Sequence, residues 1–424
     1  MRVFARHFRP AAVGPFAAKL TRVAALAAAI LVPAACEEVV DDGAHPPDAF
    51  VPETPHALAA TVWDAALPDP DPGPDADFAA TDGGLGQEKA GAVADVGGDV
   101  AALALSPTGD GYLLAYVADR DTRAVLTTVP LDVHGNPLAP PRPVASDLAD
   151  TRQLLLAWDW STDTLLAVTE DAAGLRAQRL DKRGAPRGES LTLTRAPEGH
   201  GVSAIRRPHG FEVAFLAAPD TVVLTKIPAD VSSGQVPTRH VMAAPGATAV
   251  TLADDGEARA IVYADVAARL FYRRADRVDT PRALPFSGQT PRLLADGDGL
   301  VLIVDLPLTP DVAELSATRL SNDGTSASRS PHTVVKATSS EAWRATLRPR
   351  GGLGLLWRSP DPEGTLLLGR FDAAGHPEGA PDVLPLEAIP VPAVAFRREG
   401  GLACGLGPDK GGATWAIRCH VVRP

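Results

Sequence analysis

Short apolar runs alternate with polar turns along most of the chain, and this pattern predicts strands rather than helices. Runs such as VAALALS (100–106), GYLLAYV (111–117) and DTLLAVT (163–169) are seven residues long and lie among Gly, Asp and Pro residues. Apolar runs of this length between turn residues are typical of buried strands. The pattern therefore predicts an all-β domain.

One turn pattern occurs three times: a large apolar residue, then Asp, two variable residues, Gly, another variable residue and Pro. It starts at Leu131 (LDVHGNP), Leu180 (LDKRGAP) and Phe371 (FDAAGHP). Looser copies lie between the last two, with the Asp position occupied by Asp230, Asp276 and Ser321. The Asp-equivalent positions 132, 181, 230, 276, 321 and 372 are 45 to 51 residues apart. A period of this length, with short strands between turns, is typical of a β-propeller.

The residue types of this turn suit a reversal of the chain. An Asp side chain can accept hydrogen bonds from the turn backbone, Gly tolerates positive φ, and Pro fixes φ at the exit. Prolines are also frequent in the stretches that follow, at positions 137, 140, 141 and 143 in one copy and 281 and 285 in another. Because proline lacks an N–H, we expect these stretches to form the outer, edge strands of the blades.

Counting the apolar runs that begin each repeat predicts seven blades. The expected first strands are 100–106, 151–158, 202–207, 247–252, 290–295, 342–348 and 391–397. In the last repeat, TWAIRCHVV (414–422) is a third strand with no fourth after it, whereas EKAGAVADVGG (88–98) precedes the first repeat. We therefore expect a seven-bladed propeller of four-stranded blades over 85–424, in which an N-terminal strand completes the seventh blade and closes the ring.

The N-terminal residues have the pattern of an export signal. Five cationic residues and no acidic ones precede Cys36, and the apolar run 23–32 is shorter than the about 20 residues of a membrane-spanning helix. With Ala34 and Ala35 before Cys36, residues 1–35 resemble a bacterial lipoprotein signal peptide. The resemblance implies lipidation of Cys36, palmitate included, and an outer-membrane lipoprotein facing the periplasm or the surface. The alternative is ordinary cleavage near the same alanines, giving a soluble secreted or periplasmic protein.

Residues 36–84 have the composition of a disordered tether. They contain twelve Asp or Glu, eight Pro and no Lys or Arg, so they cannot bury enough apolar surface to fold. The leader carries five positive charges, so only about −5 of the net charge of −12 belongs to the propeller. Nucleic-acid binding needs a basic face, and we therefore expect no nucleic-acid partner.

The two remaining cysteines, Cys404 and Cys419, lie on either side of the expected turn 409–412 in the last repeat. Consecutive antiparallel strands would bring them opposite each other. Disulfides persist in exported proteins, so we expect a Cys404–Cys419 bond in the closing blade. The alternative is a pair of reduced thiols in the core.

The loops after the second strands are acidic, and in a propeller they would share one face. Their carboxylates could surround the channel mouth and bind a calcium ion or a basic partner through oxygen ligands. The alternative is that Asp serves there only as a turn residue. The candidate residues are Asp119, Asp121, Glu170, Asp171, Asp220, Asp265, Asp311, Asp361, Glu363 and Asp409.

Motifs of known catalytic chemistry are missing from the sequence: there is no GxSxG, HExxH, CxxC or Walker-type loop. Residues 85–424 resemble propeller lipoproteins in general, without matching a named functional family. We expect a monomeric, non-catalytic binding or scaffolding domain, anchored to the membrane by lipid, whose partner is an envelope protein or a surface ligand. The alternatives are a calcium-assisted hydrolase or lyase at the channel mouth, and a glycan-binding adhesin that uses Trp158 and Trp160.

Overall fold

The computed structural model describes parts of the compact unit Val62–Pro424. The described residues are 92–96, 99–120, 123–148, 150–195, 201–218, 220–230, 237–256, 259–277, 280–295, 299–309, 312–326, 331–337, 343–349, 351–360, 363–372, 374–387, 392–398, 400–408 and 415–422. Within these ranges no helix is long and apolar enough to cross a membrane. The expected leader and tether, including Cys36, lie outside them.

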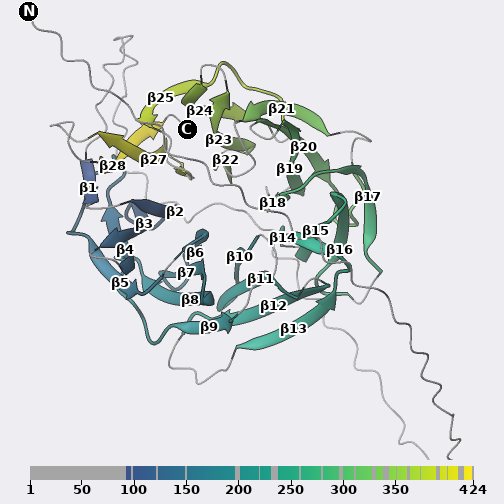
Figure 1. Cartoon of the computed structure of the whole chain (residues 1–424), viewed down its shortest axis with the longest axis horizontal. Coiled ribbons are helices and arrows are strands. Elements are labelled where there is room, and N and C mark those ends of the chain that lie inside the picture. Colours follow the sequence, from purple (N-terminus) through teal and green to yellow (C-terminus); the bar gives the residue numbers. More distant parts are fainter. Residues whose placement is uncertain are drawn as a thin grey trace, which may run out of the picture. The chain divides into compact units, whose positions relative to one another are not determined.

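The described residues form seven blades of four antiparallel strands each (Figure 1). Blade 1 contains β2 (Val100–Pro107), β3 (Tyr112–Arg120), β4 (Arg123–Leu131) and β5 (Arg142–Ser146). Blade 2 contains β6 (Gln153–Asp159), β7 (Thr164–Asp171), β8 (Gly174–Asp181) and β9 (Leu191–Thr194). Blade 3 contains β10 (Ser203–Arg207), β11 (Gly210–Ala218), β12 (Thr221–Pro228) and β13 (Thr238–Ala243).

The remaining blades continue in sequence order around the ring (Figure 1). Blade 4 contains β14 (Ala247–Asp254), β15 (Arg259–Asp265), β16 (Arg269–Arg274) and β17 (Arg282–Ser287). Blade 5 contains β18 (Arg292–Ala295), β19 (Leu300–Thr309), β20 (Val312–Leu320) and β21 (His332–Ala337). Blade 6 contains β22 (Trp343–Leu347), β23 (Leu353–Pro360), β24 (Glu363–Phe371) and β25 (Asp382–Glu387). Blade 7 contains β26 (Ala393–Arg397), β27 (Gly400–Pro408), β28 (Trp415–Val422) and β1 (Ala92–Val96).

The first strand of each blade lies innermost and the fourth outermost (Figure 1). Within a blade the strands reverse direction at each step, so the loops fall on two faces of the ring. We call the face with the hairpins between first and second strands and the turns between third and fourth strands the motif face. The opposite face carries the hairpins between second and third strands and the connections from blade to blade.

The core consists of seven clusters of buried apolar side chains, and each cluster joins two neighbouring blades. Strand β3 shows how one strand serves two clusters. Tyr112, Leu114 and Tyr116 pack against blade 7, whereas the alternate residues Leu113 and Ala115 pack against blade 2. Because both faces of the blade are covered, the second strands are continuous apolar runs rather than alternating ones.

The ring is closed by the pairing of β1 with β28, as the sequence predicts. The two strands are antiparallel, with Val96 opposite Trp415 and Ala92 opposite Arg418. Val93 and Val96 are buried in the cluster that joins blade 7 to blade 1. Residues from before the first blade therefore complete the last one, and β28 has a partner on each side.

The predicted disulfide is present. Cys404 in β27 and Cys419 in β28 lie directly opposite each other, and their sulfurs are bonded. Both side chains belong to the same buried cluster between blades 7 and 1. The bond thus lies beside the seam at which the two ends of the propeller sequence meet.

The repeated turn is formed as its residues predict. In blade 2, Asp181 Oδ1 accepts hydrogen bonds from the backbone N–H groups of Arg183 and Ala185 at 2.9 and 2.8 Å. Gly184 has φ +79° and donates its N–H to the Asp181 carbonyl at 2.9 Å. Asp132 in blade 1 and Asp372 in blade 6 accept the equivalent pair of bonds. Among the described residues, the same Asp-centred turn therefore ends the third strand in blades 1, 2 and 6.

The turn also contacts the preceding blade, which adds a second reason for its glycine. A Cβ on Gly184 would lie 2.4 Å from Thr128 Oγ1 in blade 1, and the Thr128 hydroxyl donates to the Gly184 carbonyl at 3.0 Å. In blade 5, a Cβ on Gly324 would lie 2.2 Å from the Tyr272 ring of blade 4. Only a residue without a side chain allows this approach.

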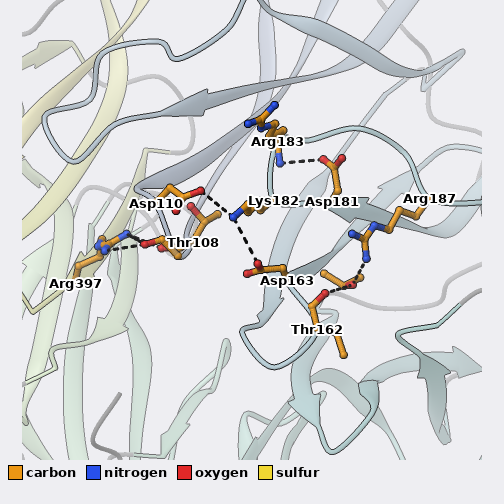
Figure 2. A network of polar contacts seen from close by, with 11 residues as sticks. Thr108, Asp110, Thr162, Asp163, Asp181, Lys182, Arg183, Arg187 and Arg397 are labelled. Carbon is orange, nitrogen blue, oxygen red and sulfur yellow. Dashed lines mark hydrogen bonds and ion pairs between the residues drawn. The ribbon is translucent and has the colours of Figure 1, made fainter. Parts of the chain in front are cut away.

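Polar contacts also join neighbouring blades on the motif face (Figure 2). Lys182 Nζ, in the blade 2 turn, lies 3.0 Å from Asp110 of blade 1 and 3.6 Å from Asp163 of blade 2. Arg397 of blade 7 donates to the carbonyls of Thr108 and Gly111 in blade 1 at 2.5 and 3.1 Å. The Lys182 pairs are exposed and contribute little stability, whereas Arg397 caps several carbonyls of one hairpin.

The proline-rich stretches differ partly from the prediction. Pro143 and Pro285 lie in the outer strands β5 and β17. Pro137, Pro140 and Pro141 precede β5, and Pro137 forms an isolated bridge to Leu131. These three prolines therefore belong to the turn and its exit, because their fixed φ suits the reversal before the edge strand begins.

The contact between turn and blade predicts different costs for two glycine substitutions. Gly351 has φ +87° in a turn with the same backbone hydrogen bonds, but a Cβ there meets nothing within 4 Å. Gly351→Ala should cost the about 1–2 kcal/mol of a left-handed non-glycine residue. Gly184→Ala should cost about 1–3 kcal/mol more, because it overpacks the blade interface. The measurement is the free energy of unfolding in denaturant, and equal losses for the two variants would contradict the interface role.

Candidate functional site

A cavity of about 780 Å³ lies among the innermost strands of blades 2 to 6, in the central channel. Its walls are mainly apolar, and the residues come from β6, β10, β14, β18 and β22 with the hairpins after β10 and β14. Cavities of this size accept small organic molecules. The apolar lining residues are Leu155, Leu156, Val202, Ala204, Ile205, Pro208, Leu252, Ala253, Leu293, Leu294, Ala295, Ala345 and Leu347.

The hydroxyl groups in the lining hold neighbouring blades together. Ser203 Oγ of β10 donates to the Leu252 carbonyl of β14 at 3.1 Å and accepts from the Leu252 N–H at 3.1 Å. Thr251 Oγ1 accepts from the Leu293 N–H of β18 at 3.0 Å. These hydroxyls are thus engaged with backbone groups of the adjacent first strand.

Arg206 and Arg207 end β10 and point their charges toward two carboxylates. Arg206 Nε donates to Asp159 Oδ1 at 2.8 Å, and its guanidinium lies 4.1 Å from the centre of the Trp160 ring. Arg207 forms an ion pair with Asp254. Both arginines are therefore fixed by partners from neighbouring blades.

Asp159 is fully buried and accepts four hydrogen bonds. Burial by itself would raise the pKa of this carboxyl, but hydrogen bonds from Ser161, Arg206 and Thr162 outweigh it and lower the pKa below 3.8. The carboxylate is therefore charged at neutral pH and holds Arg206 at the channel.

Two further arginines line the cavity at the beginning of their strands. Arg292 opens β18, and Arg344 is the second residue of the neighbouring first strand β22. Arg344 Nη1 donates to the Trp343 carbonyl at 2.7 Å. Burial lowers the pKa of Arg292, and the carboxylate of Asp305 offsets part of that effect. The channel therefore presents four guanidinium groups and the carboxylates of Asp254 and Asp255 between apolar walls.

Of the predicted acidic residues, some are buried in the structure and others are exposed. Glu170 and Asp171 are buried at the end of β7, and Asp171 Oδ1 accepts the Ala173 N–H of its own hairpin at 2.7 Å. Asp265 is buried at the end of β15, where Oδ2 accepts from Arg269 Nε at 2.7 Å. Burial would raise the pKa of Asp265, but the hydrogen bonds from Arg269 and Ala267 lower it. The carboxylates of Asp171 and Asp265 thus stabilise their own turns.

Asp119 and Asp220 are exposed on the opposite face. Asp220 Oδ1 accepts the Gly246 N–H of the connection to blade 4 at 2.6 Å. Asp121, Asp311, Asp361 and Asp409 lie outside the described residues, as does the side chain of Glu363. Within the described ranges, no three His, Cys, Asp or Glu residues form a group that could hold a metal ion.

The two tryptophans singled out in the sequence have different surroundings. Trp158 packs against the cluster between blades 1 and 2, whereas Trp160 is 46% exposed and lies under Arg206. They therefore do not form one aromatic platform. Sequence reasoning missed the channel arginines, although Arg206, Arg207, Arg292 and Arg344 all stand in the short runs expected as first strands.

Comparison with known proteins assigns no family: no protein-family model and no curated protein matches the chain. Among solved structures, AofleA from Arthrobotrys oligospora is 13% identical, with a TM-score of 0.46 over 69% of this chain and 88% of that one. A Bacteroides uniformis protein, provisionally described as a 6-phosphogluconolactonase, is 13% identical, with a TM-score of 0.45 over 67% of this chain and 85% of its own. Hsv2 from Kluyveromyces lactis is 11% identical, with a TM-score of 0.41, and the coverages are 76% and 98%.

Similarity at this level carries no functional assignment. The class of the protein, a seven-bladed β-propeller, rests on the pairing of its own strands.

The lowered pKa of Asp159 predicts a pH dependence of stability. The folded-state pKa lies below the ordinary aspartate pKa of 3.8, so the contribution of this carboxylate is present above about pH 4 and is lost as pH falls through the folded pKa. Asp159→Asn should lower the free energy of unfolding at pH 7 by about 1.5–3 kcal/mol, because a hydrogen-bonded charge is removed. The loss should shrink as pH falls toward 3.

The measurement is the urea denaturation midpoint at several pH values between 3 and 7. Asp110→Asn, at an exposed ion pair on the motif face, serves as the control for loss of a surface carboxylate. If Asp159→Asn lowers the stability by the same amount at every pH, the lowered pKa of Asp159 would be contradicted.

Proposed function

We propose that this protein is a non-catalytic binding or scaffolding propeller, held at the bacterial envelope by a lipidated Cys36. The observation that carries the proposal is that polar side chains around the ring form hydrogen bonds that hold the fold together. Ser203 and Thr251 in the channel, Asp181 in the repeated turn and Asp265 on the opposite face all hold backbone or a neighbouring arginine. Groups occupied in this way make a rigid frame rather than a reactive centre.

A closed ring suits binding because it holds many loops in fixed positions. Each blade packs against two neighbours, and the closing strand removes the open edge of blade 7. Loops on a rigid scaffold can bind a partner without a large entropic cost of ordering. In this proposal the exposed carboxylates of the opposite face, Asp119 and Asp220 among them, contact a basic surface of an envelope protein.

The membrane attachment is tested by metabolic labelling with palmitate. The wild-type chain should incorporate the label and fractionate with the outer membrane, and Cys36→Ser should lose both properties. Label that persists in Cys36→Ser, or a wild-type chain that takes up none, would contradict the anchor.

The binding function is tested by crosslinking the tagged full-length protein in cells and identifying what co-purifies. We expect one partner in stoichiometric amount. Asp119→Asn with Asp220→Asn should reduce its recovery severalfold, because both side chains are exposed on the opposite face. The matched control is Asp110→Asn with Asp163→Asn, two exposed carboxylates of the motif face that should leave recovery unchanged. Equal losses in both double variants, or no partner at all, would contradict the proposal.

A further inference from the structure

The central cavity combines a charged group with an environment that solvates it poorly. Arg292 lines the cavity and is partly buried, between walls made mainly of leucine, alanine, isoleucine and valine side chains. A guanidinium in such surroundings is stable only when its charge and its N–H groups find acceptors. If the protein does not supply these acceptors, a ligand in the cavity can supply them.

Among the described residues, none forms a hydrogen bond or an ion pair with the Arg292 guanidinium. The carboxylate of Asp305 interacts with it electrostatically; Asp305 is fully buried, its Oδ1 accepts from the N–H and hydroxyl of Thr290, and its Oδ2 has no hydrogen-bond partner among the described residues. By contrast, Arg206 and Arg207 in the same cavity each have a carboxylate partner. Arg292 thus lines the cavity without a hydrogen-bonded acceptor among the described residues, and its nearby counter-charge is Asp305.

Arg344 adds a second guanidinium to the lining of this cavity. It lines the same cavity from β22, which neighbours β18 in the ring, and one of its N–H groups holds the Trp343 carbonyl. Guanidinium groups bind carboxylate and phosphate oxygens in pairs, with two N–H donors for each acid group. Guanidinium groups on two adjacent first strands thus give this part of the lining a cationic character that suits an organic acid.

We propose that the channel is a binding site for a small organic anion, with its acid group at Arg292 and its apolar body against the leucine walls. The shared chemistry is a terminal carboxylate or phosphate on a short hydrocarbon. The cavity of about 780 Å³ has room for such a molecule. This inference goes beyond the proposed function, because the channel lining is separate from the acidic residues of the opposite face.

The experiment is isothermal titration of the full chain carrying Cys36→Ser, which removes the acyl chains. The probes are hexanoate, hexyl phosphate, and hexanol as the uncharged control of the same body. We expect at least one anion to bind and hexanol not to bind. Tighter binding of hexanoate or of hexyl phosphate tells whether the natural ligand carries a carboxylate or a phosphate.

The variant Arg292→Gln should weaken binding of the anion by about 10- to 100-fold, the loss expected for hydrogen bonds to a charged group. Arg142→Gln, at an exposed arginine of the outer strand β5, is the matched control and should bind like the wild type. Arg292→Lys keeps the charge and should bind with intermediate affinity, which separates lost recognition from lost folding. Equal binding by Arg292→Gln and the wild type, or no binding of either anion, would overturn the inference.

A failed titration leaves the crosslinking test of the opposite face unaffected. Conversely, a missing envelope partner does not change the expected titration. The two proposals can therefore fail separately.

Discussion

The pairing of β1 with β28 is the contact on which the rest of the structure depends. Each of the seven apolar clusters is shared by two blades, so no blade buries both faces without both of its neighbours. The cluster between blades 7 and 1 includes Val93 and Val96 of β1 and both bonded cysteines. Without β1, this cluster would lose apolar side chains and the edge of β28 would be exposed to pairing with other chains.

Directional contacts between blades reinforce the ring. The turn at the end of the third strand in blade 2 contacts blade 1, and the corresponding turn in blade 5 contacts blade 4. Because the turn glycine lies against the preceding blade, the repeat combines chain reversal and blade spacing in one motif. The same rigidity brings first strands close enough for Arg206 to reach Asp159, and it fixes the groups that line the channel.

The sequence predicts the strands well because turn chemistry is local. Asp, Gly and Pro at fixed offsets locate the ends of the third strands, and the run 414–422 corresponds to β28. The channel site is harder to predict, since Arg292 and Arg344 are 52 positions apart and line the same cavity only because the blades pack side by side. Likewise, the acidity of Asp171 and Asp265 is visible in the sequence, but their burial depends on how each hairpin folds over its own carboxylate.

The central claim, that β1 is an integral strand of the ring, is tested most directly by hydrogen exchange of the intact protein under native conditions. If β1 closes blade 7, amides in Ala92–Val96 should exchange as slowly as those in β27 and β28, through unfolding of the whole ring. Exchange of the β1 amides that is orders of magnitude faster than exchange in β27 would show that the strand opens by itself. That result would contradict a ring whose stability depends on closure.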